Sequence, residues 1–224
     1  MRKCTCQGKT RSSPKKLKES LEVFVGIPLV TRGDRYSDFL PRALDAIRGQ
    51  KSKIRIWDVY VTPELTRDIG EFQGPWVGRG INLIIDEFKK TPCSHLWIVN
   101  VDTVVPSDAL EKLIRLNVDL ASGVEPTHKG VGRTSVTRLV RGRMVPYSLE
   151  QLRGRVVGEH ETVATGNFCM LAKRRLFKYL QYGESIYGSE VKFYTDAQRL
   201  GYTVRIHGGV VCGHLPEWPL ESLT

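Results

Sequence analysis

The sequence predicts a layered α/β domain, because short β-like apolar runs alternate with segments of helical periodicity along most of the chain. Its 224 residues, 41% of them hydrophobic, are enough to build one substantial core. No internal repeat is found. We therefore expect a basic tail over residues 1–20 and a single domain over residues 21–224.

The first half of the domain is expected to alternate strands and helices. Phe39, Leu40, Leu44 and Ile47 recur near the spacing of one helical face, which predicts the first helix. Ser107 is a plausible N-cap for a later helix. The expected order is a strand over 21–27, a loop over 28–34, a helix over 37–48, a strand over 54–61, a loop over 62–78, a helix over 80–89, a strand over 96–101 and a helix over 108–116.

The second half continues the alternation with one irregular stretch. Residues 128–155 show weak periodicity and predict either a hairpin or a flap at one side of the domain. The remaining expected elements are strands over 120–124 and 168–172, a helix over 174–182, a Gly-rich loop, a helix over 190–200, and strands over 203–207 and 210–212.

The formal net charge of +10 attracts polyanions such as nucleotides, nucleic acid or acidic membrane surfaces. Residues 1–20 contain seven basic residues and one acidic residue, so the tail carries +6 and the domain +4. Because no nucleic-acid-binding motif accompanies the charge, a solvated tail and loop are preferred to dedicated nucleic-acid binding. Contact of the tail with an anionic membrane surface stays open. Residues 133–155 hold six arginines and could likewise become ordered on a partner or a membrane.

The chain is expected to be cytoplasmic, at most peripheral to a membrane. The apolar run over 23–30 is too short to cross a bilayer, and the charged first twenty residues contain no signal-peptide core. Five cysteines form neither an even disulfide framework nor a paired zinc motif. Cys93, Cys169 and Cys212 sit in apolar surroundings and are expected to be reduced packing residues.

Two strand ends carry the most informative polar residues. The buried strand over 96–101 delivers Asp102 to the rim of a sheet, and a later strand end supplies His214. A carboxylate and an imidazole at one rim outline a site for a metal and a diphosphate.

The ordered motifs over residues 21–215 resemble the GT-A type glycosyltransferases, most closely the family 2-like group. The resemblance implies a Rossmann-like, mixed, mainly parallel sheet flanked by helices in a single domain, with a nucleotide-sugar-binding half over 21–119 and an acceptor-side half over 120–224. The motifs are Ile27-Pro28, Thr31-Arg32, Arg79, the run 99–102, the run 119–123, Thr165-Gly166-Asn167, the run 188–193, the run 200–202 and His214.

This resemblance implies a metal-dependent enzyme that moves a sugar, of the hexosyl type, from a nucleotide-diphosphate sugar to an acceptor hydroxyl. The leaving diphosphate needs its charge neutralised, which a hard divalent cation does through oxygen ligands. Donor binding would fall on Pro28, Thr31, Arg32, Arg79, Asn100 and Asp102.

The implied metal ligands are Asp102 and His214. Asn100 stands where the family has the first aspartate of Asp-x-Asp, so metal affinity falls mainly on Asp102. A nitrogen ligand at His214 would favour Mn²⁺ over Mg²⁺. A lone histidine is more often a packing residue, but Gly208, Gly209 and Gly213 would let the backbone approach a ligand closely.

Glu190 is the expected catalytic base, at the place where inverting members of the family carry an acidic residue before a helix. The competing interpretation is a glutamate that the helix dipole favours. Gly166 and Asn167 are expected to leave room for the acceptor or the donor sugar. Inversion is preferred to retention, while the donor sugar, the nucleobase and the acceptor, whether glycan, lipid or protein, stay open.

Two other functions compete with this one. A nucleotidyltransferase would carry a Gly-rich, basic loop after its first strand, which residues 25–29 do not supply. A polyanion or nucleic-acid binding protein on a degenerate scaffold would explain the basic tail and the asparagine at position 100.

Overall fold

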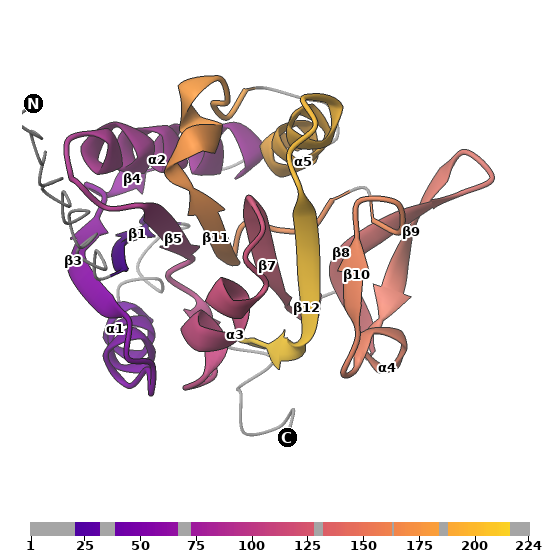
Figure 1. Cartoon of the computed structure of the whole chain (residues 1–224), viewed down its shortest axis with the longest axis horizontal. Coiled ribbons are helices and arrows are strands. Elements are labelled where there is room, and N and C mark those ends of the chain that lie inside the picture. Colours follow the sequence, from indigo (N-terminus) through magenta and orange to yellow (C-terminus); the bar gives the residue numbers. More distant parts are fainter. Residues whose placement is uncertain are drawn as a thin grey trace, which may run out of the picture.

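The computed structural model describes residues 21–31, 39–66, 73–127, 132–162, 164–183 and 188–215, so the predicted tail and Arg32 lie outside the described residues. No described helix combines the length and the apolar composition that a membrane crossing requires. The elements (Figure 1) are β1 (Glu22–Ile27), β2 (Val30–Thr31), α1 (Leu40–Arg48), β3 (Arg55–Val61), β4 (Leu65–Thr66), α2 (Gln73–Lys89), β5 (His95–Val99), β6 (Thr103–Val104), α3 (Ala109–Arg115), β7 (Leu120–Val124), β8 (Arg133–Val140), β9 (Arg143–Ser148), α4 (Leu149–Leu152), β10 (Val156–Gly158), β11 (Cys169–Lys173), the 3-10 helix η1 (Arg174–Lys178), α5 (Ser189–Arg199), β12 (Val204–Val211) and β13 (Gly213–His214).

A seven-stranded sheet in the order β10-β12-β7-β11-β5-β1-β3 forms the centre of the molecule. β1 pairs in parallel with β3 and β5, and β7 pairs in parallel with β12. β11 and β10 run antiparallel to their neighbours. The predicted mixed, mainly parallel sheet is therefore confirmed. The central strands read as continuous apolar runs because helices cover both of their faces.

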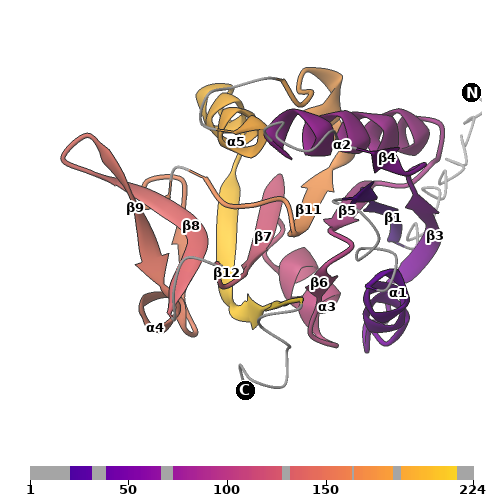
Figure 2. The same cartoon turned by 180° about the vertical axis from the view of Figure 1, so that it is seen from behind.

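Helices α2 and α5 cover one face of the sheet, and α1 and α3 cover the other (Figures 1 and 2). Each face has its own hydrophobic cluster. Phe88, Phe177 and Phe193 are among the side chains on the α2/α5 face. Trp97 and Ile47 are among those on the α1/α3 face. The resulting three layers bury the sheet and leave its two strand-end edges for polar residues.

Helix α2 begins at Gln73, so the expectation of a loop as far as residue 78 was wrong for its last six residues. Three glycines and a proline in residues 73–80 lower intrinsic helix propensity, which is why the sequence looked like a loop. Tertiary packing overrides that propensity. A Cβ at Gly78 would lie 3.2 Å from the Ser189 Cβ, and one at Gly80 would lie 3.3 Å from the Pro28 Cβ.

Three further expectations need correction. The helix expected over 174–182 is the short 3-10 helix η1. The two strands expected over 203–207 and 210–212 are one strand, β12, with a register shift between Ile206 and Val211. Asp108, not Ser107, is the N-cap of α3, and its side chain makes no capping bond. Residues 128–155 do contain a hairpin, β8–β9, as one of the two alternatives predicted.

Gly208 is required for packing between β12 and α4. Its N–H donates to the carbonyl oxygen of Arg155 at 2.7 Å. A Cβ at this position would lie 1.7 Å from the carbonyl oxygen of Leu152. Gly208 therefore lets the backbone approach another segment of the chain, and not a ligand as expected.

Asp119 joins β7, β12 and η1 at the amino-terminal edge of the sheet. Its carboxylate is paired with Arg175 and accepts hydrogen bonds from the N–H and the hydroxyl of Thr203, at 3.0 and 2.9 Å. Burial alone would raise the pKa of Asp119, but the bonds from Arg175 and Thr203 outweigh burial and lower this pKa below its ordinary value. The residue is structural.

We expect Asp119→Ala to lower the free energy of unfolding by about 1–3 kcal/mol at pH 7, because the buried Asp119 carboxylate and its hydrogen bonds from the N–H and hydroxyl of Thr203 are lost. A carboxylate with a lowered pKa stabilises the fold above its unfolded pKa and loses that contribution as pH falls through the folded value. The difference between wild type and variant, measured by denaturant unfolding, should therefore shrink below about pH 4. Arg175→Ala is the control and should cost less than Asp119→Ala, because Arg175 is largely exposed and the Asp119 carboxylate keeps its two hydrogen bonds from Thr203. Equal costs for both variants would contradict this account.

Candidate functional site

The carboxyl ends of the parallel strands gather the predicted site residues at one edge of the sheet. β1, β5, β7 and β12 point the same way, so the residues that follow them share an edge. Contacts of Gly80 with Pro28 and of Gly78 with Ser189 bring the amino-terminal parts of α2 and α5 to this same edge. The residues concerned are Pro28 after β1, Asn100 and Asp102 after β5, Glu125 after β7, Glu190 in α5 and His214 after β12.

Asp102 and His214 are neighbours, as the sequence predicted. β13 pairs antiparallel with β6 so that His214 lies opposite Thr103, and the N–H of Leu215 donates to the Asp102 carbonyl oxygen at 2.9 Å. The His214 Nε2 lies 3.5 Å from the Asp102 Oδ2. A short backbone ladder, rather than glycine flexibility, therefore positions the imidazole.

Glu125 is a third member of the cluster that the sequence analysis missed. It is buried, its Oε1 accepts a hydrogen bond from the Thr103 hydroxyl at 2.9 Å, and its Oε2 lies 3.7 Å from the His214 Nδ1. A signal existed, because Glu125 directly follows the buried strand β7 much as Asp102 follows β5.

The ring of His214 has a defined orientation. Its Nδ1 lies 3.2 Å from the carbonyl oxygen of Pro126. A carbonyl oxygen only accepts, so Nδ1 carries a proton and donates it. The Nε2 atom, directed at Asp102, is then the nitrogen that loses its proton when the ring becomes neutral.

The cluster holds extra protons at neutral pH. Burial opposes a charge on His214, but the carboxylates of Asp102 and Glu125 outweigh burial and raise the pKa of His214 to about 9. Burial, only partly opposed by His214, raises the pKa of Glu125 to about 8. A cation that binds at His214 must therefore displace a proton.

Asn100 presents a buried polar atom that has no hydrogen-bond partner in the described part of the chain. Its backbone is fixed, because its N–H donates to the Phe168 carbonyl and its own carbonyl accepts from Thr103, both at 3.0 Å. Its side-chain Oδ1 is buried and has no hydrogen-bond partner among the described residues. A buried amide oxygen left unsatisfied is costly, so this atom is suited to accept a ligand donor or to contact a cation.

Gly166 and Asn167, the residues predicted to line a sugar pocket, pack against aromatic side chains, and one of these, Tyr182, stacks on α5. The Asn167 Oδ1 accepts a hydrogen bond from the Tyr182 hydroxyl at 2.7 Å, and the Tyr182 ring stacks on Phe193 at 4.3 Å. A Cβ at Gly166 would lie 2.8 Å from the Phe168 ring, so this glycine allows close packing. Tyr182 is a further residue that sequence reasoning did not identify.

Glu190 lies in the first turn of α5 and folds back over Gly188. Gly188 has φ +104°, and a Cβ there would lie 2.6 Å from the Glu190 Oε1. Burial raises the pKa of Glu190 above its ordinary value, with opposing bonds from its backbone and Ser189. A carboxylate with a raised pKa at a strand-end edge has the property that a general base needs.

The donor-side predictions have mixed outcomes. Pro28 is buried against α2, and the N–H of the next residue donates to the Thr62 hydroxyl at 2.8 Å. Thr31 lies in β2, but its side chain, like the whole of Arg32, is outside the described residues. Arg79 is exposed in the second turn of α2, not before a helix as expected.

Several polar and sulfur-containing residues have structural roles. His207 accepts a hydrogen bond from the Gly209 N–H at 3.0 Å. Asp196 pairs with Arg199 at 3.3 Å. Cys93, Cys169 and Cys212 are buried and free. Within the described ranges, no group of three or more His, Cys, Asp or Glu side chains is arranged to hold a metal ion.

Comparison with known proteins shows the fold alone. No family model matches the sequence, and the search of curated proteins found no relative. Among solved structures 336 chains match, so the architecture is widespread and does not by itself assign a function. One of them, A197 from STIV, is 14% identical, with a TM-score of 0.55 over 88% of this chain and 86% of that chain.

We expect the stability of the chelator-treated protein to decrease as pH rises from about 5 to about 9. Both His214 and Glu125 have raised folded pKa values, and such groups stabilise the fold below their unfolded pKa and lose that contribution as pH rises through the folded value. Glu125→Gln removes one of the two titrating groups. The loss of unfolding free energy between pH 5 and pH 9 should therefore be smaller than in wild type, by on the order of 2 kcal/mol. Glu161→Gln, at an exposed ion pair with Arg155, is the control. A pH profile that Glu125→Gln leaves unchanged would rule out these proton assignments.

Proposed function

We propose that the chain is a metal-dependent glycosyltransferase that moves a sugar from a nucleotide-diphosphate sugar to an acceptor hydroxyl. The observation that carries the proposal is the convergence of Asn100, Asp102 and His214 at the carboxyl edge of the sheet, where nucleotides bind in open α/β folds. The GT-A resemblance of the sequence supports it, and the A197 likeness agrees with the fold class.

The residues present fit a divalent cation. The Asp102 carboxylate and the His214 Nε2 are 3.5 Å apart, which suits two ligands on one ion. The unpartnered Oδ1 of Asn100 offers a further oxygen. Two or three protein ligands are enough when phosphate oxygens and water supply the rest. When bound, the ion would neutralise the charge that develops on the leaving diphosphate.

The chain's own residues have separable roles in this proposal. Asp102 and Asn100 orient the diphosphate end of the donor. Thr103, Glu125 and the Pro126 carbonyl orient His214, since a hydrogen-bonded partner on the second ring nitrogen fixes the ligand's direction. Asn167, held by Tyr182, lines the sugar side. Glu190 takes the proton of the acceptor hydroxyl, which matches its raised pKa.

Asp102→Ala should abolish the cation-dependent gain in thermal stability that a matching nucleoside diphosphate gives. A ligand that binds only the folded state at about 100-fold above its Kd raises Tm by roughly 5 to 10 °C for a domain of this size. The measurement is thermal unfolding with Mn²⁺ or Mg²⁺ and a panel of nucleoside diphosphates, which also identifies the base.

Asp86→Ala, at an exposed ion pair on α2, is the matched control and should keep the wild-type gain. A polyanion binder would respond to salt concentration instead of to the cation or the base. That result, or an unchanged gain in Asp102→Ala, would refute the metal assignment.

Glu190→Gln should lower kcat for transfer by about 10²- to 10⁴-fold and leave nucleotide binding in place, because the amide cannot accept the acceptor proton. The comparison is steady-state kinetics together with the thermal shift described above. Glu150→Gln, an exposed glutamate in the first turn of α4, is the control for a helix-dipole effect. Loss of nucleotide binding in Glu190→Gln would remove the residue from the role of base.

A further inference from the structure

The β8–β9 hairpin projects from the body of the molecule, beyond the last strands of the sheet (Figures 1 and 2). Its strands are joined by Arg141 and Gly142, which have φ +49° and +77°. Two consecutive positive φ values are typical of a type I′ turn, whose twist matches that of the strands it joins. The projection is therefore a regular hairpin with a defined tip.

The tip exposes large apolar side chains. Leu139, Met144 and Val140 have 63%, 40% and 39% of their surfaces exposed. They make up three of the eight large apolar residues that are exposed in the described part of the chain. Leu139 and Met144 are direct cross-strand partners, so both side chains lie on the same face of the hairpin. Apolar side chains concentrated on a projection usually mark an interaction surface.

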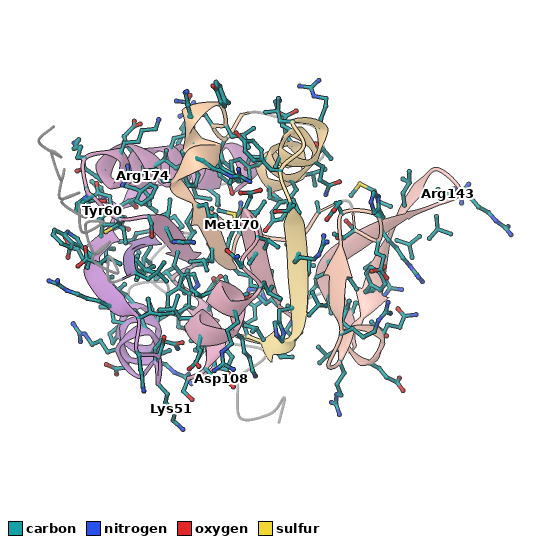
Figure 3. The ribbon with its side chains drawn as sticks, viewed as in Figure 1. Lys51, Tyr60, Asp108, Arg143, Met170 and Arg174 are labelled. Atoms are coloured by element: carbon teal, nitrogen blue, oxygen red, sulfur yellow. The ribbon has the colours of Figure 1, made fainter. Side chains whose placement is uncertain are left out.

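The same tip is strongly cationic. Residues 133–148 contain four arginines and no acidic residue. Arg141 lies in the turn and Arg143 directly follows it, and Arg143 extends outward from the tip (Figure 3). Two glutamates near the hairpin base are engaged elsewhere, because Glu161 pairs with Arg155 and Glu159 with Arg205. Among the described residues, no ion pair joins Arg141 or Arg143 to a carboxylate, and the hairpin strands themselves contain no acidic residue.

The base of the hairpin is tied to the candidate site. The Ser135 N–H donates to the Glu125 carbonyl at 3.1 Å, and Thr137 forms a bridge with Ala164. The Arg138 guanidinium stacks over the Tyr147 ring at 4.7 Å, and the Tyr147 hydroxyl donates to the Glu161 carbonyl at 2.7 Å. A hairpin that is fixed at its base in this way can hold its tip in a defined position against another surface.

We propose that the β8–β9 tip docks on a lipid bilayer that carries anionic headgroups. Leu139 and Met144 would enter the boundary between headgroups and acyl chains, while Arg141 and Arg143 contact lipid phosphates. A bilayer is favoured over nucleic acid because binding to a phosphate backbone would leave the Leu139 and Met144 side chains exposed to water. The combination of apolar and cationic residues matches both parts of a bilayer surface.

The test is co-sedimentation of the full-length chain with vesicles of phosphatidylcholine alone and of phosphatidylcholine with phosphatidylserine, without nucleotide or divalent cation. Wild type should bind the anionic vesicles. Leu139→Ser/Met144→Ser and Arg141→Ser/Arg143→Ser should each weaken binding by about tenfold or more. Because every variant keeps residues 1–20, any contribution of the basic tail is the same in all of them.

Two matched controls separate the tip from general charge and hydrophobicity. Lys51→Ser/Lys53→Ser removes two positive charges at the opposite end of the molecule, where Lys51 lies far from Arg143 (Figure 3). Leu200→Ser removes an exposed leucine outside the hairpin. Both controls should bind as wild type does, and circular dichroism should show that all variants are folded.

The proposal is overturned if both tip variants bind vesicles like wild type, or if Lys51→Ser/Lys53→Ser loses as much affinity as the tip variants. It is also overturned if the arginine variant loses single-stranded DNA binding while the Leu139/Met144 variant keeps full vesicle affinity, since that pattern indicates a nucleic-acid surface. None of these readouts requires sugar transfer, so they stand apart from the proposed enzymatic function.

Discussion

The arrangement of the candidate site depends on one constraint, the shared direction of β1, β5, β7 and β12. Parallel strands covered by helices carry mainly apolar side chains along their length, so the polar side chains of the candidate site lie where the strands end. Four such ends at one edge bring together residues that are as far apart in sequence as Pro28 and His214. Pairing of β13 with β6 then fixes the last of them beside Asp102.

The candidate site contains buried groups whose charged or polar form is unfavourable in the folded protein, chief among them the Glu125 carboxyl, whose pKa burial raises to about 8. Glu125 and His214 are held in surroundings where each keeps a proton that an unfolded chain would release at neutral pH. Asn100 adds a buried oxygen with no described partner. Structures commonly retain such unfavourable features at functional sites, where a ligand supplies the missing interaction. This pattern supports a binding role for the cluster independently of any family resemblance.

The sequence predicted the fold where periodicity was strong and failed where glycine or tertiary contacts decided the outcome. β1, β5 and β7 are buried apolar runs, and all three were expected close to their observed bounds. The start of α2 was missed because Gly78 and Gly80 lower helix propensity, while their closeness to Ser189 and Pro28 is visible only in three dimensions.

The candidate site shows the same division. Asp102 and His214 were identified from their positions after buried strands and through the family resemblance, and the structure places them together. Glu125 occupies an equivalent position after β7, yet nothing in the sequence says that β6 and β7 lie close enough for Thr103 to donate to it. Tyr182 was equally hidden, because its hydrogen bond to Asn167 depends on how η1 and α5 pack.

The segment Glu125-Pro126 connects the two surfaces for which functions are proposed. On one side the Pro126 carbonyl orients His214, and the Glu125 carboxylate lies beside the same ring. On the other side Pro126 bridges to Thr134, and the Glu125 carbonyl accepts from Ser135 at the base of the hairpin. Glu125 and Pro126 therefore contact both His214 in the candidate site and the base of the β8–β9 hairpin. The segment Glu125-Pro126 is hydrogen-bonded to the candidate site on one side and to the hairpin on the other. A membrane that binds the tip of the hairpin would therefore also fix the orientation of the candidate site relative to the membrane.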